Sequence, residues 1–141
     1  MAQSAGIALV EDFLNALARN DADAVLAFMS DDIVYQNVPL PPDRGKAKVE
    51  RTLRAFQRVM KEFSFEMLHV AETNGVVLTE RIDVIRGPLL DLRFWVCGTF
   101  EIKDGKITLW RDRFDVASFG WQLLTSPVRR AFGGHHPATP A

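Results

Sequence analysis

The first third of the chain has the hydrophobic periodicity of helices. Apolar positions over residues 7–17 recur at intervals of three and four, which predicts a helix that ends where Asn20 and Asp21 interrupt the pattern. Asp21 or Asp23 can cap a second short helix, because an aspartate side chain accepts hydrogen bonds from the backbone N–H groups of the first helical turn. The clearest helix is predicted over residues 46–63, whose apolar stripe consists of Val49, Leu53, Phe56, Met60 and Phe63.

After Ser64 the periodicity changes from that of a helix to that of a strand. Four β-rich runs follow, at about 65–72, 76–86, 91–102 and 106–116. Turn-forming pairs separate the runs: Asn74-Gly75, Gly87-Pro88 and Asp104-Gly105. Consecutive hairpins predict an antiparallel meander, which a short helix at 119–124 would close.

Helices followed by a twisted antiparallel sheet indicate an α+β domain in which the N-terminal helices pack against one sheet face. We expect a strongly curved sheet that wraps on these helices as a cone, with an open mouth that suits a small apolar ligand. Residues 1–125 would form this single domain, and residues 126–141, which contain several prolines and glycines, are expected to be a mobile tail. Apolar side chains also lie on the opposite sheet face, which predicts a homodimer across it: Val76, Leu78, Ile82 and Val84.

The composition is that of an ordinary globular domain. The chain has 141 residues, 48% of them hydrophobic and 25% charged, with a formal net charge of −1. This balance argues against a nucleic-acid partner, which requires a basic surface. Cys97 is the only cysteine, so no intrachain disulfide can form. The sequence has neither a signal-peptide pattern at its start nor an apolar run long enough to span a bilayer, so we expect a cytoplasmic protein without a membrane partner.

Three extended pieces of the chain place polar side chains on faces that are otherwise apolar. Side chains alternate across a strand, so positions two apart share a face. The same-face pairs are Tyr35 with Asn37, Arg81 with Asp83, and Trp110 with Asp112. If these faces line one cavity, it contains two carboxylates, a guanidinium, a phenol and an amide.

The residues alone leave two interpretations of these charges open. Arg81 and Asp83 could form an ordinary surface ion pair on an exposed strand. Their strand should be central in the meander, however, and buried charges require partners, for which a planar guanidinium is well suited. Asp112 is flanked on its own face by Trp110 and Phe114, which favours an interior position. The opposite face is expected to make cross-strand charge pairs through Arg111, Arg113 and Asp115.

Two carboxylates that share one arginine can differ in pKa, so that one stays ionised while the other holds a proton at neutral pH. The protonated carboxyl can donate to a leaving oxygen while the ionised one deprotonates an attacking water. A phenol and an amide, at Tyr35 and Asn37, could satisfy further hydrogen bonds of that water. Neither role requires a cofactor or a metal.

Three motifs together resemble the limonene-1,2-epoxide hydrolases. They are Tyr-Gln-Asn followed by Pro-Leu-Pro-Pro, then Thr-Glu-Arg-Ile-Asp-Val, then Gly-Lys-Ile-Thr-Leu-Trp-Arg-Asp-Arg-Phe-Asp. The similarity runs from about Val10 to Val116. It implies the nuclear-transport-factor-2-like (SnoaL-like) cone fold, a homodimer, and cofactor-independent opening of an epoxide in one step without a covalent intermediate. The run from Phe94 to Gly98 resembles a mycobacterial branch of that family that accepts bulkier lipids.

The resemblance also implies a role for each polar residue. Asp83 would be the general acid to the epoxide oxygen, and Asp112 the base for the nucleophilic water. Arg81 would bridge the two carboxylates, while Tyr35 and Asn37 would position the water. The expected partners are therefore water and a small lipophilic epoxide, of limonene type or another cyclic one.

The remaining chemistry-bearing residues have simpler interpretations. Cys97 is expected to be a buried packing residue, and His69 a core or surface residue. His135-His136 lacks other ligands for a closed metal site. The three tryptophans, Trp95, Trp110 and Trp121, either line the pocket or pack in the core. Two other functional classes fit the cone: a ketosteroid-isomerase-like or polyketide-cyclase-like enzyme, and a non-catalytic module that binds lipophilic ligands.

Overall fold

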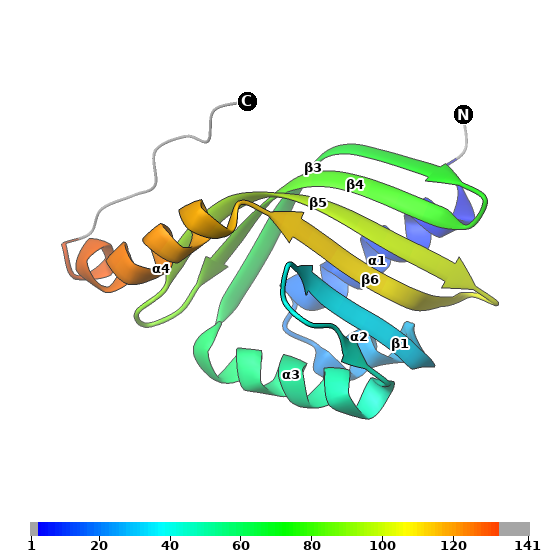
Figure 1. Cartoon of the computed structure of the whole chain (residues 1–141), viewed down its shortest axis with the longest axis horizontal. Coiled ribbons are helices and arrows are strands. Elements are labelled where there is room, and N and C mark those ends of the chain that lie inside the picture. The colour runs from blue at the N-terminus through cyan, green and yellow to red at the C-terminus, as the bar shows by residue number, and fades with distance from the viewer. Residues whose placement is uncertain (1–2, 133–141) are drawn as a thin grey trace.

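The computed structural model describes residues 3–132 (Figure 1). Four helices and six strands are formed there. In chain order they are α1 (Ala5–Ala18), α2 (Ala22–Ala27), β1 (Met29–Val38), β2 (Asp43–Arg44), α3 (Lys46–Val59), β3 (Glu62–Thr73), β4 (Val76–Arg86), β5 (Asp91–Lys103), β6 (Lys106–Phe114) and α4 (Val116–Ala131).

The strands form one sheet in the order β2-β1-β6-β5-β4-β3. The four long strands from β3 to β6 pair antiparallel in sequence order, so the predicted meander is confirmed. β1 instead pairs parallel with β6, so the sheet is mixed rather than antiparallel throughout. The alternation of side chains identifies a strand but carries no information about which neighbour it pairs with, or in which direction.

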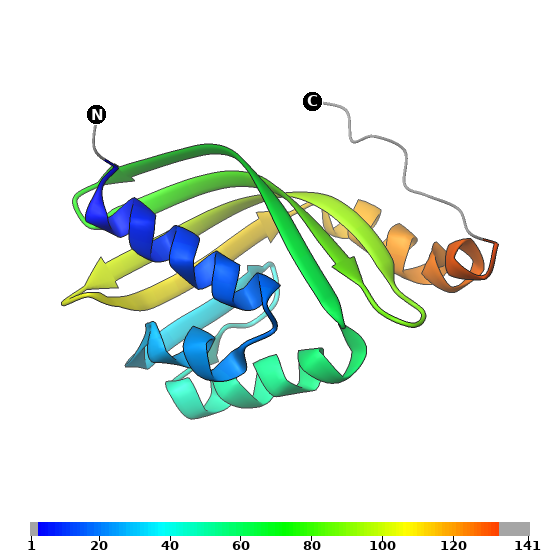
Figure 2. The same cartoon turned by 180° about the vertical axis from the view of Figure 1, so that it is seen from behind.

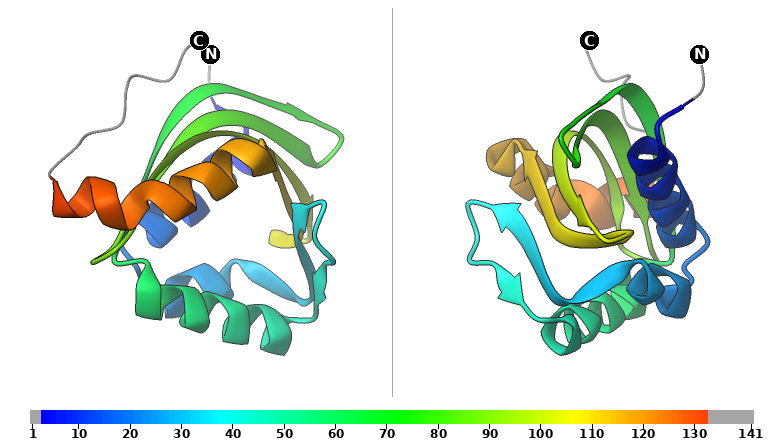
Figure 3. Two further views of the ribbon diagram at one scale, coloured as in Figure 1. Left: turned by 60° about the vertical axis from the view of Figure 1, so that its left-hand side comes forward. Right: turned by 90° about the vertical axis from the view of Figure 1, so that its right-hand side faces the viewer.

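The helices α1, α2 and α3 cover the concave face of the sheet (Figure 2). The curved sheet and α3 face each other across the interior, which gives the cone-shaped α+β fold that was expected (Figure 3). The core is packed where α1 crosses the strands: the Phe13 ring meets those of Phe100 and Trp110 edge-on, at centroid distances of 5.9 and 5.0 Å. This packing fills the space between α1 and the sheet.

Side-chain caps fix the starts of the helices. The Ser4 hydroxyl accepts from the Ile7 backbone N–H to begin α1, and the Asp21 carboxylate accepts from Ala24 N–H to begin α2, as predicted. The prediction for α3 was too long. The backbone is extended at Met60, Lys61 N–H donates to the Arg86 carbonyl of β4, and Phe63 lies in β3.

α4 is longer than the short helix predicted at 119–124. It begins after Asp115, whose carboxylate accepts from two first-turn N–H groups, and it ends at Ala131. Residues 126–131, which were assigned to the tail, therefore belong to this helix. The Ser126 hydroxyl explains the extension, because it is buried and hydrogen-bonded to the backbone of Asp91 at the start of β5. Most of the expected tail, including His135-His136, lies outside the described residues.

Over the part of the chain that the structure describes, no helix is long and apolar enough to cross a membrane. The outer sheet face is apolar only in part. Leu78 is 49% exposed and Trp95 is 45% exposed, whereas Ile82 is buried.

Candidate active site

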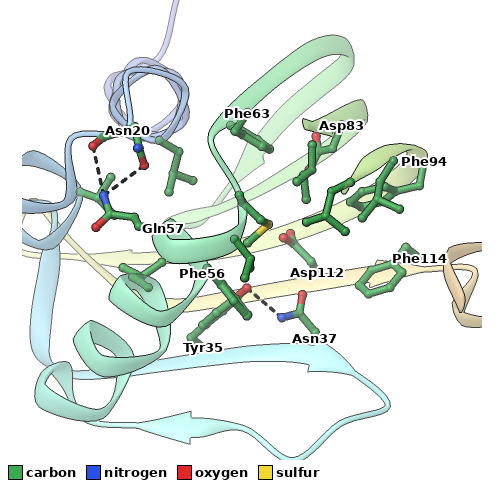
Figure 4. Close-up of a pocket in the computed structure, with 18 of the residues that line it drawn as sticks. Asn20, Tyr35, Asn37, Phe56, Gln57, Phe63, Asp83, Phe94, Asp112 and Phe114 are labelled. Carbon is green, nitrogen blue, oxygen red and sulfur yellow. Dashed lines mark hydrogen bonds between the residues drawn. The ribbon is translucent and has the colours of Figure 1, made fainter. Parts of the chain in front are cut away.

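The concave face of the sheet borders a cavity of about 430 Å³. Its walls are mainly apolar and come from α3, β5, β6 and α4, as in the side chains Phe56, Met60, Phe94, Phe114, Phe119 and Leu123. A polar group of side chains from β1, β4 and β6 interrupts this lining on the sheet side, where Asp83, Asp112, Tyr35 and Asn37 point into one space (Figure 4). A cavity with few convergent polar groups is typical of a small-molecule site.

Arg81 bridges the two aspartates. Its Nε and Nη2 atoms donate to Oδ1 and Oδ2 of Asp83 at 2.8 and 3.1 Å, and Nη2 also donates to Oδ2 of Asp112 at 2.9 Å. All three residues are buried, with Arg81 only 1% exposed. This arrangement rules out the surface ion pair and confirms that side chains from separate hairpins meet in the interior.

The register of the sheet explains why these residues meet. Arg81 and Asp83 project from the same face of β4, and Asp112 projects from the same face of β6, with β5 between them. Asn37 of β1 is the register partner of Asp112 on its other side. A long guanidinium side chain can span β5, whereas an aspartate on β4 could not reach an aspartate on β6 directly.

The two oxygens of Asp112 have different surroundings. Oδ2 accepts from Arg81 Nη2 and from Trp110 Nε1, the latter at 3.1 Å. Oδ1 is buried and has no hydrogen-bond partner among the described residues. An unpartnered carboxylate oxygen at the wall of a cavity is a candidate acceptor for a ligand or a substrate water.

Tyr35 and Asn37 lie beside this carboxylate. The Asn37 side-chain amide donates to Tyr35 Oη at 2.8 Å, so the phenol keeps its own proton to donate elsewhere (Figure 4). The Tyr35 ring stacks on the Trp110 ring with a centroid distance of 4.0 Å, and both rings are buried. The stacking fixes the direction of the phenol oxygen relative to the Asp112 carboxylate.

Burial sets the protonation of the site. It raises the pKa of Asp83 to about 6, against the opposing charge of Arg81. Burial also raises the pKa of Asp112, again opposed by Arg81, and burial together with Asp112 raises the pKa of Tyr35 so that it remains a neutral phenol. Burial alone would lower the pKa of Arg81, but the charges of Asp112 and Asp83 raise it by more than burial lowers it. The pKa therefore lies above its ordinary value, and the guanidinium stays charged.

This arrangement can hold one proton on a carboxyl and leave a second carboxyl ionised at neutral pH. The two aspartates share one guanidinium nitrogen, so their titrations are coupled and belong to the pair. A group that donates a proton and a group that accepts one therefore face the same apolar cavity, as general acid–base chemistry requires.

The structure brings together all five residues that the sequence selected: Tyr35, Asn37, Arg81, Asp83 and Asp112. Their catalytic roles remain predictions. Sequence reasoning missed Thr79, which is buried and accepts from Arg81 Nη1 at 3.1 Å. Its position, two residues before Arg81 on the same face of β4, was a signal that could have found it.

Several residues outside the site differ from expectation. Cys97 is partly exposed rather than buried, because it lies on the outer sheet face, where burial still raises the pKa of its thiol. Arg111 and Arg113 pair with the polar side chains of Gln36 and Thr99 rather than with charges, and Asp115 caps α4.

The remaining histidine and tryptophan predictions are resolved by burial. His69 is exposed and lies 2.9 Å from the Glu80 carboxylate. Trp95 and Trp121 are exposed as well, so of the three tryptophans only Trp110 lines the cavity. Within residues 3–132, no three His, Cys, Asp or Glu side chains are grouped to hold a metal ion.

Comparison with known proteins gives a family match over most of the chain. The model of the limonene-1,2-epoxide hydrolase catalytic domain matches residues 4–124. Epoxide hydrolase EphG of Mycobacterium tuberculosis is 47% identical over 120 residues, which cover 84% of this chain and 79% of that protein.

Solved structures agree with the fold. An M. tuberculosis LEH-like epoxide hydrolase superposes with a TM-score of 0.81 at 40% identity, over 92% of this chain and 96% of its own. An NTF2-like protein of unknown function from Burkholderia pseudomallei superposes with a TM-score of 0.77 at 15% identity, over 86% and 98% of the two chains. The second likeness concerns the fold alone.

Proposed function

The chain belongs to the limonene-1,2-epoxide hydrolase family and is an epoxide hydrolase of that type, and we propose that it adds water in one step to a lipophilic epoxide, limonene-type or otherwise cyclic, to give a vicinal diol. The observation that carries this proposal is the buried bridge in which Arg81 holds both Asp83 and Asp112 at the wall of an apolar cavity. The apolar walls suit a hydrocarbon body, and the polar group suits its epoxide.

Asp83 is the general acid. Its pKa of about 6 leaves part of the population protonated near neutral pH. When Asp83 donates its proton to the epoxide oxygen, it becomes the anion that the Nε and Nη2 donors of Arg81 accommodate in a two-point contact. The bridge therefore stabilises the charge that develops on Asp83 during ring opening.

Asp112 is the base. A water beside it can donate one hydrogen to Asp112 Oδ1 and the other to the free carbonyl oxygen of Asn37, while it accepts from the Tyr35 hydroxyl. These three bonds leave one lone pair of the water for the epoxide carbon. The Tyr35–Trp110 stack and the Asn37 hydrogen bond support this geometry, because they fix Tyr35 and Asn37, two of the three partners of the water, before substrate binds.

The proton balance closes over one turnover. The C–O bond of the epoxide breaks as the water oxygen bonds to carbon. Asp83 gives its proton to the former epoxide oxygen, and Asp112 takes one from the water. One proton then returns from Asp112 to Asp83 through solvent in the cavity that both carboxyls line.

We also propose that the chain works as a homodimer through the outer sheet face. Exposed Leu78 and Trp95 lie on that face together with the partly exposed Val76 and Val84. A second copy would cover these apolar side chains. Sedimentation of the purified protein tests this proposal, and a monomer at micromolar concentration would contradict it.

The catalytic proposal is tested with a panel of cyclic and long-chain epoxides, with diols detected by mass spectrometry. The wild-type chain should form diol from at least one cyclic epoxide, and Asp112→Asn should form it roughly 10²–10⁴-fold more slowly. Asp104→Asn is the matched control, because Asp104 lies in the β5–β6 turn at a positive φ that asparagine tolerates. Absence of diol with every epoxide, or undiminished turnover by Asp112→Asn, would overturn the proposal.

A further inference from the structure

The guanidinium of Arg81 lies over a glycine. Thr79 of β4, Gly98 of β5 and Asp112 of β6 are register partners in one row across three neighbouring strands. Arg81 follows Thr79 on the same face of β4 and reaches along this row to Asp112. Gly98 is therefore the backbone position that the bridge must pass.

A side chain at Gly98 would occupy the place of the bridge. A Cβ atom there would lie 2.5 Å from Arg81 Nη1, 2.7 Å from Thr79 Oγ1 and 2.9 Å from Asp112 Oδ1. Each distance is shorter than real Cβ contacts allow. The backbone of Gly98 is not in the left-handed region, so no turn requires glycine here. A glycine inside a strand often marks a close approach of other groups, and here those groups are the polar atoms of the site.

Thr79 holds the other end of the guanidinium. Its hydroxyl oxygen accepts from Arg81 Nη1 at 3.1 Å, and the residue is 4% exposed. Without this acceptor the Nη1 group would lose its only side-chain partner among the described residues, in a place that water does not reach. Neither Thr79 nor Gly98 lines the cavity, so neither touches a bound substrate.

We propose that Thr79 and Gly98 are positioning residues, which together fix the Arg81 guanidinium so that one nitrogen contacts both catalytic carboxylates. Gly98 leaves the space in which the guanidinium lies, and Thr79 sets its rotation by anchoring Nη1. This inference rests on the proposed acid–base mechanism, but the geometry that it explains does not depend on which epoxide is the substrate.

Displacement of the Arg81 guanidinium would change the pKa values of the groups that face it. They are Asp83 on its own strand and Asp112 on β6, with the Tyr35 phenol of β1 as the third titratable group. Arg81 opposes the effect of burial on both carboxyls. A displaced guanidinium therefore leaves the carboxyls with less stabilisation of their charged forms, and their pKa values should rise.

The first test replaces Gly98 with alanine. Gly98→Ala should lower kcat by about 10²-fold, as displacement of catalytic groups by roughly 1 Å does, and leave KM within about twofold. The carboxyl pKa of Asp83, followed by ¹³C NMR, should rise above its wild-type value. Gly120→Ala is the control, because a Cβ at Gly120 of α4 has no atom within 4 Å. A Gly98→Ala variant with wild-type kcat and wild-type Asp83 titration would overturn the inference.

The second test keeps the shape of Thr79 and removes its hydroxyl. Thr79→Val should lower kcat roughly tenfold and raise the pKa of Asp83, because a buried charged donor loses its acceptor. Thr79→Ser keeps the acceptor and should restore both quantities. Thr99→Val makes the same change on the outer face of β5, where the hydroxyl accepts from an exposed arginine, and should change neither.

The two tests remain informative if Gly98→Ala fails to fold, because Thr79→Val and Thr79→Ser then decide. Equal kcat and equal Asp83 titration in Thr79→Val and Thr79→Ser would overturn the inference. The NMR titration also separates this inference from the proposed function. A wild-type chain that opens no epoxide contradicts the function, whereas an unchanged Asp83 pKa in the variants contradicts the positioning.

Discussion

Asn37 and Asp112 are register partners in the parallel pair of β1 and β6, and both line the cavity. The amide that holds the Tyr35 phenol therefore lies beside the carboxylate that Arg81 reaches from the opposite side. Parallel pairing at the edge of the meander completes the site, because the antiparallel hairpins alone would supply only the charged groups.

The two aspartates should be distinguishable by an added nucleophile. Asp83→Asn and Asp112→Asn should each reduce hydrolysis by roughly 10²–10⁴-fold, the usual contribution of a general acid or base. Azide needs no deprotonation, so it should restore ring opening in Asp112→Asn, with azido alcohol as the product. Asp83→Asn should gain nothing from azide, because the epoxide oxygen still lacks its proton donor. Rescue of Asp83→Asn alone would reverse the two assignments.

Removal of the bridge should reduce both activity and stability. Arg81→Ala leaves two buried carboxylates without their counter-charge and should lower the free energy of unfolding by about 3–5 kcal/mol. Turnover should be lost as well. Arg54→Ala breaks an exposed ion pair with Glu50 and should leave the melting temperature nearly unchanged. Urea unfolding of both variants measures the difference, and an Arg81→Ala protein with wild-type stability and turnover would show that the bridge has no function.

The pH dependence of azide opening isolates the acid. In Asp112→Asn the reaction needs only a protonated Asp83, so its rate should fall as pH rises above about 6. Wild-type hydrolysis should show a second, acidic limb, because protonation of Asp112 removes the base. Between pH 5 and pH 8 the proton concentration changes by about three orders of magnitude. An azide reaction with a constant rate over this interval would contradict the assignment of Asp83 as the acid.

The same pKa predicts how stability changes with pH. The folded chain holds a proton on Asp83 that the unfolded chain releases above its ordinary value of 3.8. The free energy of unfolding should therefore decrease as pH rises from 3.8 to about 6. Asp83→Asn should reduce this slope, which denaturant titrations at several pH values can measure for both chains.

Chelation should not affect the rate. The described residues contain no cluster of His, Cys, Asp or Glu able to hold a metal ion. In the proposed mechanism, Asp83 and Asp112 supply both proton transfers. Dialysis against EDTA should therefore leave epoxide turnover unchanged. A loss of activity that added divalent metal restores would contradict a purely acid–base mechanism.

Much of the fold follows from periodicity and turns. The hairpins at Asn74-Gly75 and Asp104-Gly105 were predictable because both pairs favour the positive φ values that the turns adopt. The parallel partner of β1 was not, because a strand's own pattern says nothing about its neighbour. The end of α3 was also missed, since Phe63 continues the apolar stripe of the helix although it lies in β3.

The site was predictable to the extent that its residues carry obvious chemistry. Alternation placed Arg81 with Asp83 and isolated Asp112 between aromatic residues. Thr79 and Gly98 escaped notice, because a threonine is ordinary in a strand and a glycine offers no chemistry of its own. Alternation along β4 could have placed Thr79 beside Arg81, whereas only the register that aligns Gly98 with Asp112 places that glycine at the site.

The most direct test of direct water attack is a single turnover in H₂¹⁸O with enzyme in excess over a cyclic epoxide. Attack by the water held at Asp112 predicts one ¹⁸O atom in the diol of the first turnover and none in the protein. If an aspartate instead attacked the epoxide to form an ester, the first diol would be unlabelled and the ¹⁸O would be found in that aspartate's carboxylate. The second result would contradict the assignment of Asp112 as a base.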